Sequence, residues 1–267
     1  MISKLVRRNI AATKGRLLLM LLSIVLGVSF VSGSFLLADS LRAIFSDITE
    51  TAFAGIDAQV RGTESDLSTG EEAVRIPEVI FDTIAGLPEV EYAEAGLSAF
   101  FQVYTVGDDG EVNRPQGPPV FANSWGGPSV ASSFALRDGQ APVGNQIAID
   151  TTQAEAEGLV VGDQIQVSGP GIEKLLDVEV AGIVSFGASD ALGGAYFNLF
   201  DLPTMQTLMG ASGTIDSIIV NGRDDVSNAE LVRSMRAALG DDGSLEVVSG
   251  TTLMDEQSGE FNEFINI

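Results

Sequence analysis

The feature that most constrains this chain is an apolar run of twenty-one residues without a charge, from Leu17 to Leu37. As an α-helix rising 1.5 Å per residue, the run would be about 32 Å long, which is enough to cross a hydrocarbon core of about 30 Å. Five basic residues precede it, and all 37 acidic residues follow it. Because positively charged flanks stay in the cytoplasm, we expect a cytoplasmic amphipathic segment at residues 1–16, a transmembrane helix at residues 17–37 and an extracytoplasmic remainder.

A cleaved signal peptide is the alternative, since it also begins with basic residues and turns apolar. Signal peptides have apolar regions of about 7 to 15 residues and a small-x-small cleavage site. This run is longer, and no such site follows it. The next segment keeps a helical period as far as Gly55, and its apolar face carries Leu41, Ile44, Phe45 and Ile48. We therefore expect residues 38–55 to continue the helix out of the bilayer as a stalk, with these side chains as its transmission face.

Small residues recur four positions apart inside the expected span. They form two pairs, Ser23 with Gly27 and Ser29 with Gly33. Small residues at this spacing allow a second helix to approach closely in a membrane, so these four positions are candidates for helix packing. Chance occurrence of Ser and Gly produces the same spacing nearly as often.

The composition excludes several classes of function. Beyond residue 38, nine Lys and Arg stand against 37 acids, which gives a formal charge of −28 and disfavours binding to nucleic acid or anionic lipid. The absence of cysteine removes disulfides and thiol nucleophiles, and the absence of histidine removes the usual general base and the common zinc motifs. No P-loop sequence is present, so any ATP hydrolysis belongs to a separate subunit. We therefore predict a protein that is not an enzyme, with no catalytic, cofactor-binding or metal-binding residues.

Pairs of adjacent aspartates are the nearest approach to carboxylate chemistry. They occur at Asp108–Asp109, Asp224–Asp225 and Asp241–Asp242, each beside a glycine. Such clusters are typical of turns, and none has the spacing of a calcium-binding loop. A membrane-anchored enzyme that uses carboxylates alone would need two of these acids to converge in one pocket.

The extracytoplasmic part is predicted to be an α+β domain. The first part of this region is predicted to form a strand, a helix that starts near Pro77 and a further strand. The same order recurs much later, with the strand IDSIIVNG, a helix at about residues 227–239 and the strand SLEVVSG. These two strand-helix-strand units, assigned to residues 56–124 and 214–250, are expected to share one small sheet. Between them, residues 125–213 hold short apolar runs separated by turns, which predicts an inserted β-rich subdomain. Trp125 is interpreted as a packing anchor.

The C-terminal residues 251–267 are expected to form a second stalk helix. Thr251 or Thr252 is predicted to cap it, and Phe261, Phe264 and Ile265 form an apolar stripe that is still helical in period at the last residue. We expect this helix to lead into a second span encoded after Ile267. An apolar run of about 20 residues in the following codons would support this reading, and a stop codon or a polar linker would contradict it.

Several local patterns, taken in order, resemble a known family. They are the basic start, the span that runs into a stalk, V-R-G at Val60–Gly62, I-P-E at Ile76–Glu78, L-V-V-G-D-Q-I-Q-V at Leu159–Val167 and V-A-G-I-V at Val180–Val184. In this order they resemble the FtsX-like, MacB-type permeases of ABC transporters, in particular the large actinobacterial members. The resemblance covers essentially the whole chain, and the later spans of the family are missing from it.

The resemblance implies a mechanotransmission function. A separate cytoplasmic ATPase would close a permease dimer or pseudo-dimer in the cell membrane, and the two stalks would carry that motion to the outer domain. The outer domain would then act on an extracytoplasmic partner such as a lipoprotein, a lipid, a peptide or a cell-wall hydrolase. A single-span anchored adaptor or sensor that works without an ATPase is the alternative of a different class.

Overall fold

The computed structural model describes residues 14–53, 55–63, 74–100, 103–106, 112–113, 118, 120–129, 131–187, 195–240 and 243–256. The chain forms two compact units. Residues 1–47 and 262–267 belong to the first unit, and residues 48–261 form the second.

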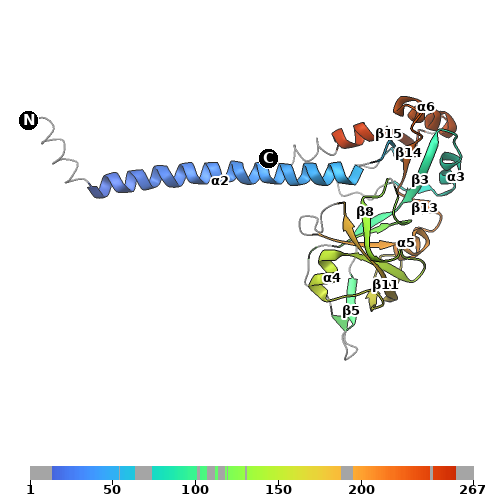
Figure 1. Cartoon of the computed structure of the whole chain (residues 1–267), viewed down its shortest axis with the longest axis horizontal. Coiled ribbons are helices and arrows are strands. Elements are labelled where there is room, and N and C mark those ends of the chain that lie inside the picture. Colours follow the sequence, from blue (N-terminus) through green and yellow to red (C-terminus); the bar gives the residue numbers. More distant parts are fainter. Residues whose placement is uncertain are drawn as a thin grey trace, which may run out of the picture. The chain divides into compact units, whose positions relative to one another are not determined.

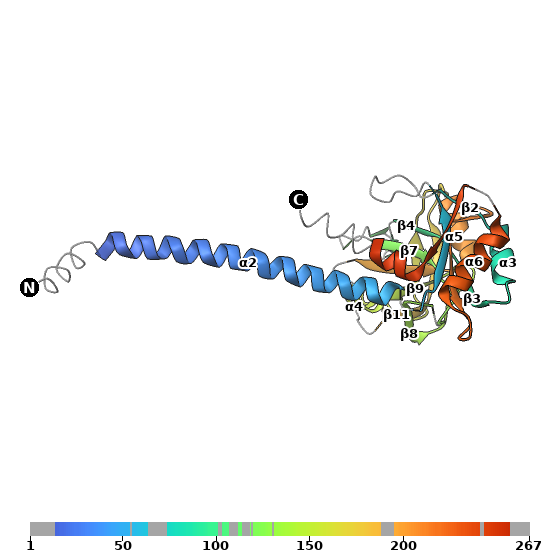
Figure 2. The same ribbon diagram turned by 90° about the horizontal axis from the view of Figure 1, so that it is seen from above.

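The first unit is described through a long helix, α2 (Lys14–Phe53), which Figures 1 and 2 show as one continuous element. Within it, Leu18–Leu36 is the one stretch of the described residues that is long and apolar enough to cross a membrane. Its side chains are exposed on every side of the helix. A helix that is apolar all round requires an apolar environment, as the interior of a membrane provides. The span and the first stalk expected from the sequence are therefore parts of a single helix.

The second unit contains a four-stranded antiparallel sheet with the strand order β15-β1-β14-β3. Its strands are β15 (Leu245–Ser249), β1 (Ala58–Gly62), β14 (Ser217–Gly222) and β3 (Val90–Gly96). Two helices, α3 (Val79–Ala85) and α6 (Asn228–Leu239), lie beside each other against it (Figure 1). Both expected strand-helix-strand units are present, and they interleave their strands in one sheet.

The two faces of this sheet have different side chains because successive strand residues point to opposite faces. The helix-covered face is apolar, and its buried cluster includes Ala58, Val60, Ile84, Ile218, Val220, Leu231, Met235 and Val247. The opposite face carries Arg61, Tyr92, Glu246 and Val248. This second face, which neither α3 nor α6 covers, is where the candidate site lies.

The second unit also contains a nine-stranded mixed sheet, with the order β4-β7-β12-β9-β11-β10-β5-β6 and with β8 paired to β11. Its strands are β4 (Ser98–Phe100), β5 (Val103–Val106), β6 (Val112–Asn113), β7 (Val120–Ser124), β8 (Phe134–Gly139), β9 (Gln146–Asp150), β10 (Gln164–Val167), β11 (Leu176–Phe186) and β12 (Tyr196–Phe200). Two of its pairings, β12 with β7 and β11 with β9, are parallel. It is the β-rich part predicted from the short apolar runs.

The chain changes from one sheet to the other at Leu97. β3 ends at Gly96, Leu97 is fully buried, and β4 begins at Ser98. The β-rich part was expected to start at residue 125, and the stretch before and around that position, residues 115–133, is rich in Pro, Gly and Ser. That stretch contains β7, whose register pairs Ala122 with Ala99 of β4.

Two short helices cover one face of the nine-stranded sheet. They are α4 (Thr151–Glu157) and α5 (Leu202–Met209), and each is capped by an aspartate: Asp150 accepts from the amide of Gln153 at 2.9 Å, and Asp201 accepts from that of Thr204 at 3.0 Å. A capping carboxylate satisfies an amide that has no partner within the helix. Helix α5 was not predicted from the sequence.

A polar contact joins α5 to the α/β part. Gln206, which is buried, donates from Nε2 to Glu78 Oε2 at 2.7 Å and to the carbonyl oxygen of Thr214 at 3.2 Å. Next to it, the two-residue strands β2 (Ile76–Pro77) and β13 (Thr214–Ile215) pair with each other. The two sheets are thus connected here as well as at Leu97.

A buried polar group lies under α4. Asn198 donates to Gln153 Oε1 at 3.1 Å, and Gln153 donates to Glu157 Oε1 at 3.4 Å. Glu157 Oε2 is buried without a hydrogen-bond partner. Burial and the neighbouring Asp150 raise the pKa of Glu157, although its hydrogen bond from Gln153 acts in the other direction. Ionised Glu157 is therefore a cost to the folded state.

We predict that Glu157→Gln stabilises the protein near pH 7. The pKa of Glu157 is raised in the folded protein, so the contribution of this side chain to stability is fully present below its unfolded pKa. That contribution is lost as the pH rises through the folded pKa. Removing the charge should therefore gain about 1 kcal/mol at pH 7 and nothing near pH 4. Denaturant melts across this pH range measure the difference, with Glu155→Gln on the exposed side of the same helix as the control. An equal effect of both variants at pH 7 would refute the prediction.

Candidate functional site

The candidate site is the place where the two expected stalks join the four-stranded sheet. α2 ends at Phe53 and β1 begins at Ala58, while β15 ends at Ser249 and a helical turn follows at residues 250–256. Ala58 is paired with Ser249 in the ladder between β1 and β15. The end of α2 and the start of the second helical segment therefore meet at the same end of two paired strands. We call residues 53–61 and 246–256 the junction.

The backbones of the two parts of the junction lie close together. Gly55 ends α2 with a φ of +78°, which only glycine adopts readily. The amide of Gly250 then donates to the carbonyl oxygen of Asp57 at 2.8 Å. A Cβ at position 250 would lie 2.0 Å from the carbonyl oxygen of Ile56, so only glycine fits where the two backbones lie this close.

Asp57 fixes the connection between α2 and β1. Its Oδ2 accepts from Asn221 Nδ2 and from the amide of Gly222, both at 2.9 Å. Asn221 Nδ2 also donates to the carbonyl oxygen of Gly55 at 3.1 Å. Gly55 and Asp57 are thus both tied to β14, so the connection is not a free hinge.

The helical turn at residues 250–256 is capped by Ser249. Its Oγ accepts from the amide of Thr252 at 3.2 Å and lies 2.9 and 2.8 Å from the hydroxyl oxygens of Thr251 and Thr252. The prediction of Thr251 or Thr252 as the cap was therefore wrong by two or three residues. The reason is that the turn starts directly at the end of β15, where the serine hydroxyl is already in position.

An apolar cluster holds the junction together on the second face of the sheet. Ile56, Val248 and Leu253 are buried in it together with Ala131, and its partly buried members are Phe53, Tyr92 and Ile219. Phe53 and Ile56 flank the end of the first stalk, and Leu253 belongs to the start of the second. We call this group the junction cluster. It places both stalk ends and the sheet in a single packed group.

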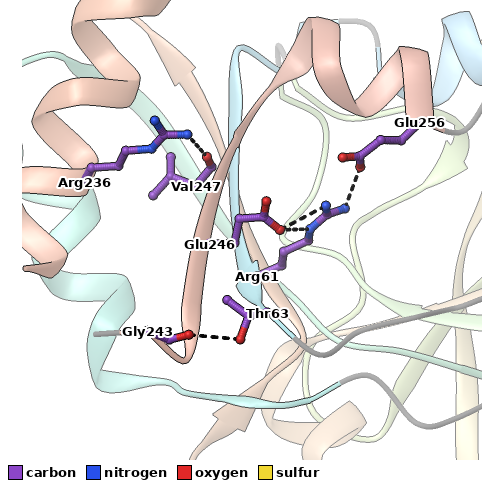
Figure 3. Close-up of polar contacts among 7 residues, drawn as sticks. All are labelled: Arg61, Thr63, Arg236, Gly243, Glu246, Val247 and Glu256. Atoms are coloured by element: carbon purple, nitrogen blue, oxygen red, sulfur yellow. Dashed lines mark hydrogen bonds and ion pairs between the residues drawn. The ribbon is translucent and has the colours of Figure 1, made fainter. Parts of the chain in front are cut away.

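An ion-pair network lies beside the cluster, with Arg61 between two glutamates (Figure 3). Arg61 of β1 lies opposite Glu246 of β15, and its Nη2 and Nε are 3.1 and 3.2 Å from Glu246 Oε2. Its Nη1 is 3.0 Å from Glu256 Oε2 on the second helical segment. Partial burial alone would lower the pKa of Arg61, but the hydrogen bonds and charges of Glu256 and Glu246 raise it above its ordinary value.

The cluster contributes more to stability than the ion pairs. All three charged side chains are partly exposed, and such pairs contribute about 0–1 kcal/mol each. Burying a side chain such as that of Leu253 contributes about 1.5–3 kcal/mol. Arg61 therefore sets the direction of the segment 250–256 from β15, and the cluster holds it in place.

A side chain of α6 binds the edge strand β15. Arg236 donates from Nη2 to the carbonyl oxygen of Val247 at 2.8 Å (Figure 3). At the far end of the β1–β15 pair, Thr63 Oγ1 donates to the carbonyl oxygen of Gly243 at 3.1 Å. An edge strand with a satisfied carbonyl is less open to pairing with other chains.

None of the site residues predicted from the sequence is among the described members of the junction cluster or of the ion-pair network. The membrane positions Ser23, Gly27, Ser29 and Gly33 lie on α2 with exposed side chains, and a Cβ at either glycine would meet nothing within 4 Å. Leu41, Ile44, Phe45 and Ile48 lie on α2 as well, but their side chains are outside the described set. Phe261, Phe264 and Ile265 are outside the described residues altogether. Helix packing and the transmission face stay predictions.

Within the described residues, no group of three or more His, Cys, Asp or Glu is placed to hold a metal ion. Asp224 and Asp225 occupy a turn before α6, as expected. The pairs Asp108–Asp109 and Asp241–Asp242 lie outside the described residues.

Asp57, Asn221, Gly250 and Leu253 were not predicted as site residues. Arg61 was part of the V-R-G pattern, but no function was given to it. The available signal was that Arg61 is one of only nine cations in a strongly acidic region, which indicates a specific partner. The close approach at Gly250 depends on tertiary structure and has no local signal.

The comparison with protein-family models assigns residues 17–238 to the MacB-like periplasmic core domain. This match covers most of the chain, and the protein therefore belongs to that family, whose members are domains of ABC-type transporter permeases. No curated protein matches the chain in sequence.

A solved structure of a MacB periplasmic region shows the same relationship at the level of the fold. The periplasmic region of MacB from Actinobacillus actinomycetemcomitans has a TM-score of 0.57 and 11% identity, over 78% of this chain and 94% of that one. The extracellular domain of the noncanonic ABC-type transporter YknZ from Gram-positive bacteria has a TM-score of 0.46 and 13% identity, over 73% and 99%. A domain of a putative permease from Porphyromonas gingivalis has a TM-score of 0.45 and 15% identity, over 73% and 88%. The apolar helix and the MacB-like domain together indicate a membrane-anchored protein.

We predict that Gly250→Ala destabilises the second unit by about 1–3 kcal/mol, because the added Cβ overlaps the carbonyl oxygen of Ile56. Gly243→Ala is the matched control, since a Cβ there meets nothing within 4 Å. Chemical denaturation of the two variants measures the free energies of unfolding. A Gly250→Ala protein as stable as the Gly243→Ala protein would contradict the close approach.

Proposed function

We propose that the chain is the N-terminal part of an ABC transporter permease that transmits mechanical work. A separate cytoplasmic ATPase drives a permease dimer or pseudo-dimer, and the stalks at residues 38–55 and 251–267 carry the motion to the outer domain. That domain acts on an extracytoplasmic lipoprotein, lipid, peptide or cell-wall hydrolase. Membership in the MacB-like family supports the class of protein.

The observation that carries the proposal is the pairing of β1 with β15. The chain enters the four-stranded sheet from the first stalk through β1 and leaves it towards the second through β15, and these two strands pair over five residues. A one-residue slip of this register would turn every side chain to the other face of the sheet, so the pair resists shear. Displacement of either stalk end is thereby delivered to the same sheet.

The proposal requires the N-terminus in the cytoplasm and the second unit outside. The chain has no cysteine, so a single introduced cysteine is a clean probe of sidedness. A membrane-impermeant maleimide added to intact cells should label Val143→Cys, at an exposed position, and should label Ser3→Cys only after the cells are permeabilised. Labelling of Ser3→Cys in intact cells would overturn the orientation.

Transmission predicts that a break in the first stalk separates ATP hydrolysis from the external process. Ile48→Pro puts a proline inside α2, which costs about 3 kcal/mol or more locally and kinks the helix. The position follows the apolar span, so membrane insertion should be unaffected. We expect the purified full complex with Ile48→Pro to keep its ATPase activity, whereas cells that carry this variant should show the same external defect as cells that lack the protein. Ile48→Ala, which keeps the helix, is the control.

Two outcomes would contradict this function. If the Ile48→Pro protein supports the external process as well as the Ile48→Ala protein does, α2 is only a tether. If no ATPase subunit co-purifies with the native full-length protein, the chain is better explained as a single-span adaptor or sensor.

A further inference from the structure

The proposed function brings motion to the four-stranded sheet but leaves open how it reaches the nine-stranded sheet. We infer that the segment that follows β7, through Trp125 and Ala131, couples the junction to the β-rich part. We call residues 124–129 with 131 and 132 the Trp125 segment. This inference rests on the proposed function for its purpose, although its structural content can be tested without any ATPase.

The Trp125 segment begins where the chain changes sheets. The amide of Ser124 donates to the carbonyl oxygen of Leu97 at 2.8 Å, and Ser124 Oγ accepts from the amide of Leu97 at 2.9 Å. The same hydroxyl donates to the carbonyl oxygen of Ala95 at 3.1 Å. The start of the segment is therefore fixed to β3, the edge strand of the α/β part.

The next residue is fixed to the β-rich part. Trp125 is buried, and its amide donates to the carbonyl oxygen of Phe200 in β12 at 2.7 Å. Its Nε1 donates to Ser132 Oγ at 2.9 Å, and Ser132 Oγ donates to the carbonyl oxygen of Phe134 at 3.0 Å. The indole also meets the ring of Phe134 edge to face, with centroids 6.4 Å apart. Trp125 thus ties both ends of the segment to β12 and β8.

A second link returns to β3. The amide of Gly126 donates to Glu94 Oε1 at 2.8 Å, and Tyr92 donates its hydroxyl proton to Glu94 Oε2 at 2.7 Å. Tyr92 is itself a member of the junction cluster. One carboxylate therefore bridges the segment and the cluster.

Ala131 completes the connection because it is buried inside the junction cluster. Its neighbours there include Ile56, Val248 and Leu253, which belong to the two stalk ends and to β15. A close-packed group cannot be displaced on one side without moving the other side, so a shift of the stalk ends moves Ala131. From Ala131 the displacement passes through Ser132 and Trp125 to β8 and β12.

Two adjacent valines of β15 provide a matched test. Val248 lies in the junction cluster and Val247 in the helix-covered core, and both are 4% exposed. Val→Ala removes the same atoms in both cases, but on opposite faces of one strand. Trp125 is the only tryptophan in the chain, so its fluorescence reports on the Trp125 segment alone.

The experiment compares acrylamide quenching of Trp125 and hydrogen exchange of the full chain in detergent for the two variants. We expect Val248→Ala to raise quenching, to shift the emission to the red and to speed exchange in residues 124–132 roughly tenfold, while Val247→Ala leaves these signals at the parent level. Equal effects of both variants, or an effect of Val248→Ala that is confined to residues 245–256, would overturn the inference.

A milder change tests the same coupling from the other side and covers the case in which Val248→Ala does not fold. Ala131→Gly removes one buried methyl group from the cluster and should speed exchange at the amides of Gly250 and Thr252. No change there would refute the coupling. Either failure would leave the proposed function standing, whereas the Ile48→Pro experiment can fail while these results hold.

Discussion

The pairing of β1 with β15 is the interaction on which the rest of the structure depends. It pairs β1, which starts at residue 58, with β15, which ends at residue 249. The first and last strands of the domain are therefore neighbours in one sheet. The 2.8 Å hydrogen bond from Gly250 to Asp57 continues this pairing one step beyond the sheet. The domain between residues 58 and 249 therefore starts and ends on two paired strands.

The two faces of the same strands have separate tasks. Val247 and its neighbours pack under α3 and α6 and hold the sheet together. Val248 and Glu246, which point the other way, meet the stalk ends and Arg61. The charged groups on this second face are partly exposed, whereas the apolar cluster beside them is buried. In the proposed function, this second face is the one that would receive the motion of the stalks, and the helix-covered core lies on the other side of the strands.

Much of the fold could be predicted because its signals are local. The uncharged run predicted the membrane helix, and periodicity with turn residues predicted α3, α6 and most of the strands. The elements that were missed lack such signals. β7 lies in a stretch rich in Pro and Gly and becomes a strand only through pairing with β4 and β12, and α5 has a polar, proline-containing start. The junction was predicted only in outline, since Gly250, Asn221 and Ala131 acquire their importance from contacts with residues far away in the sequence.

The central claim is that nucleotide binding in the cytoplasm changes the position of the outer domain relative to the membrane helix. Because the chain has no cysteine, spin labels can be placed at Ser40→Cys on α2 and Val143→Cys on the β-rich part of the full complex. Pulsed electron paramagnetic resonance then measures the distance between the labels with and without ATP and vanadate. The account predicts a nucleotide-dependent shift of the distance distribution that Ile48→Pro abolishes. The same distribution in both nucleotide states, in a complex that hydrolyses ATP, would contradict it.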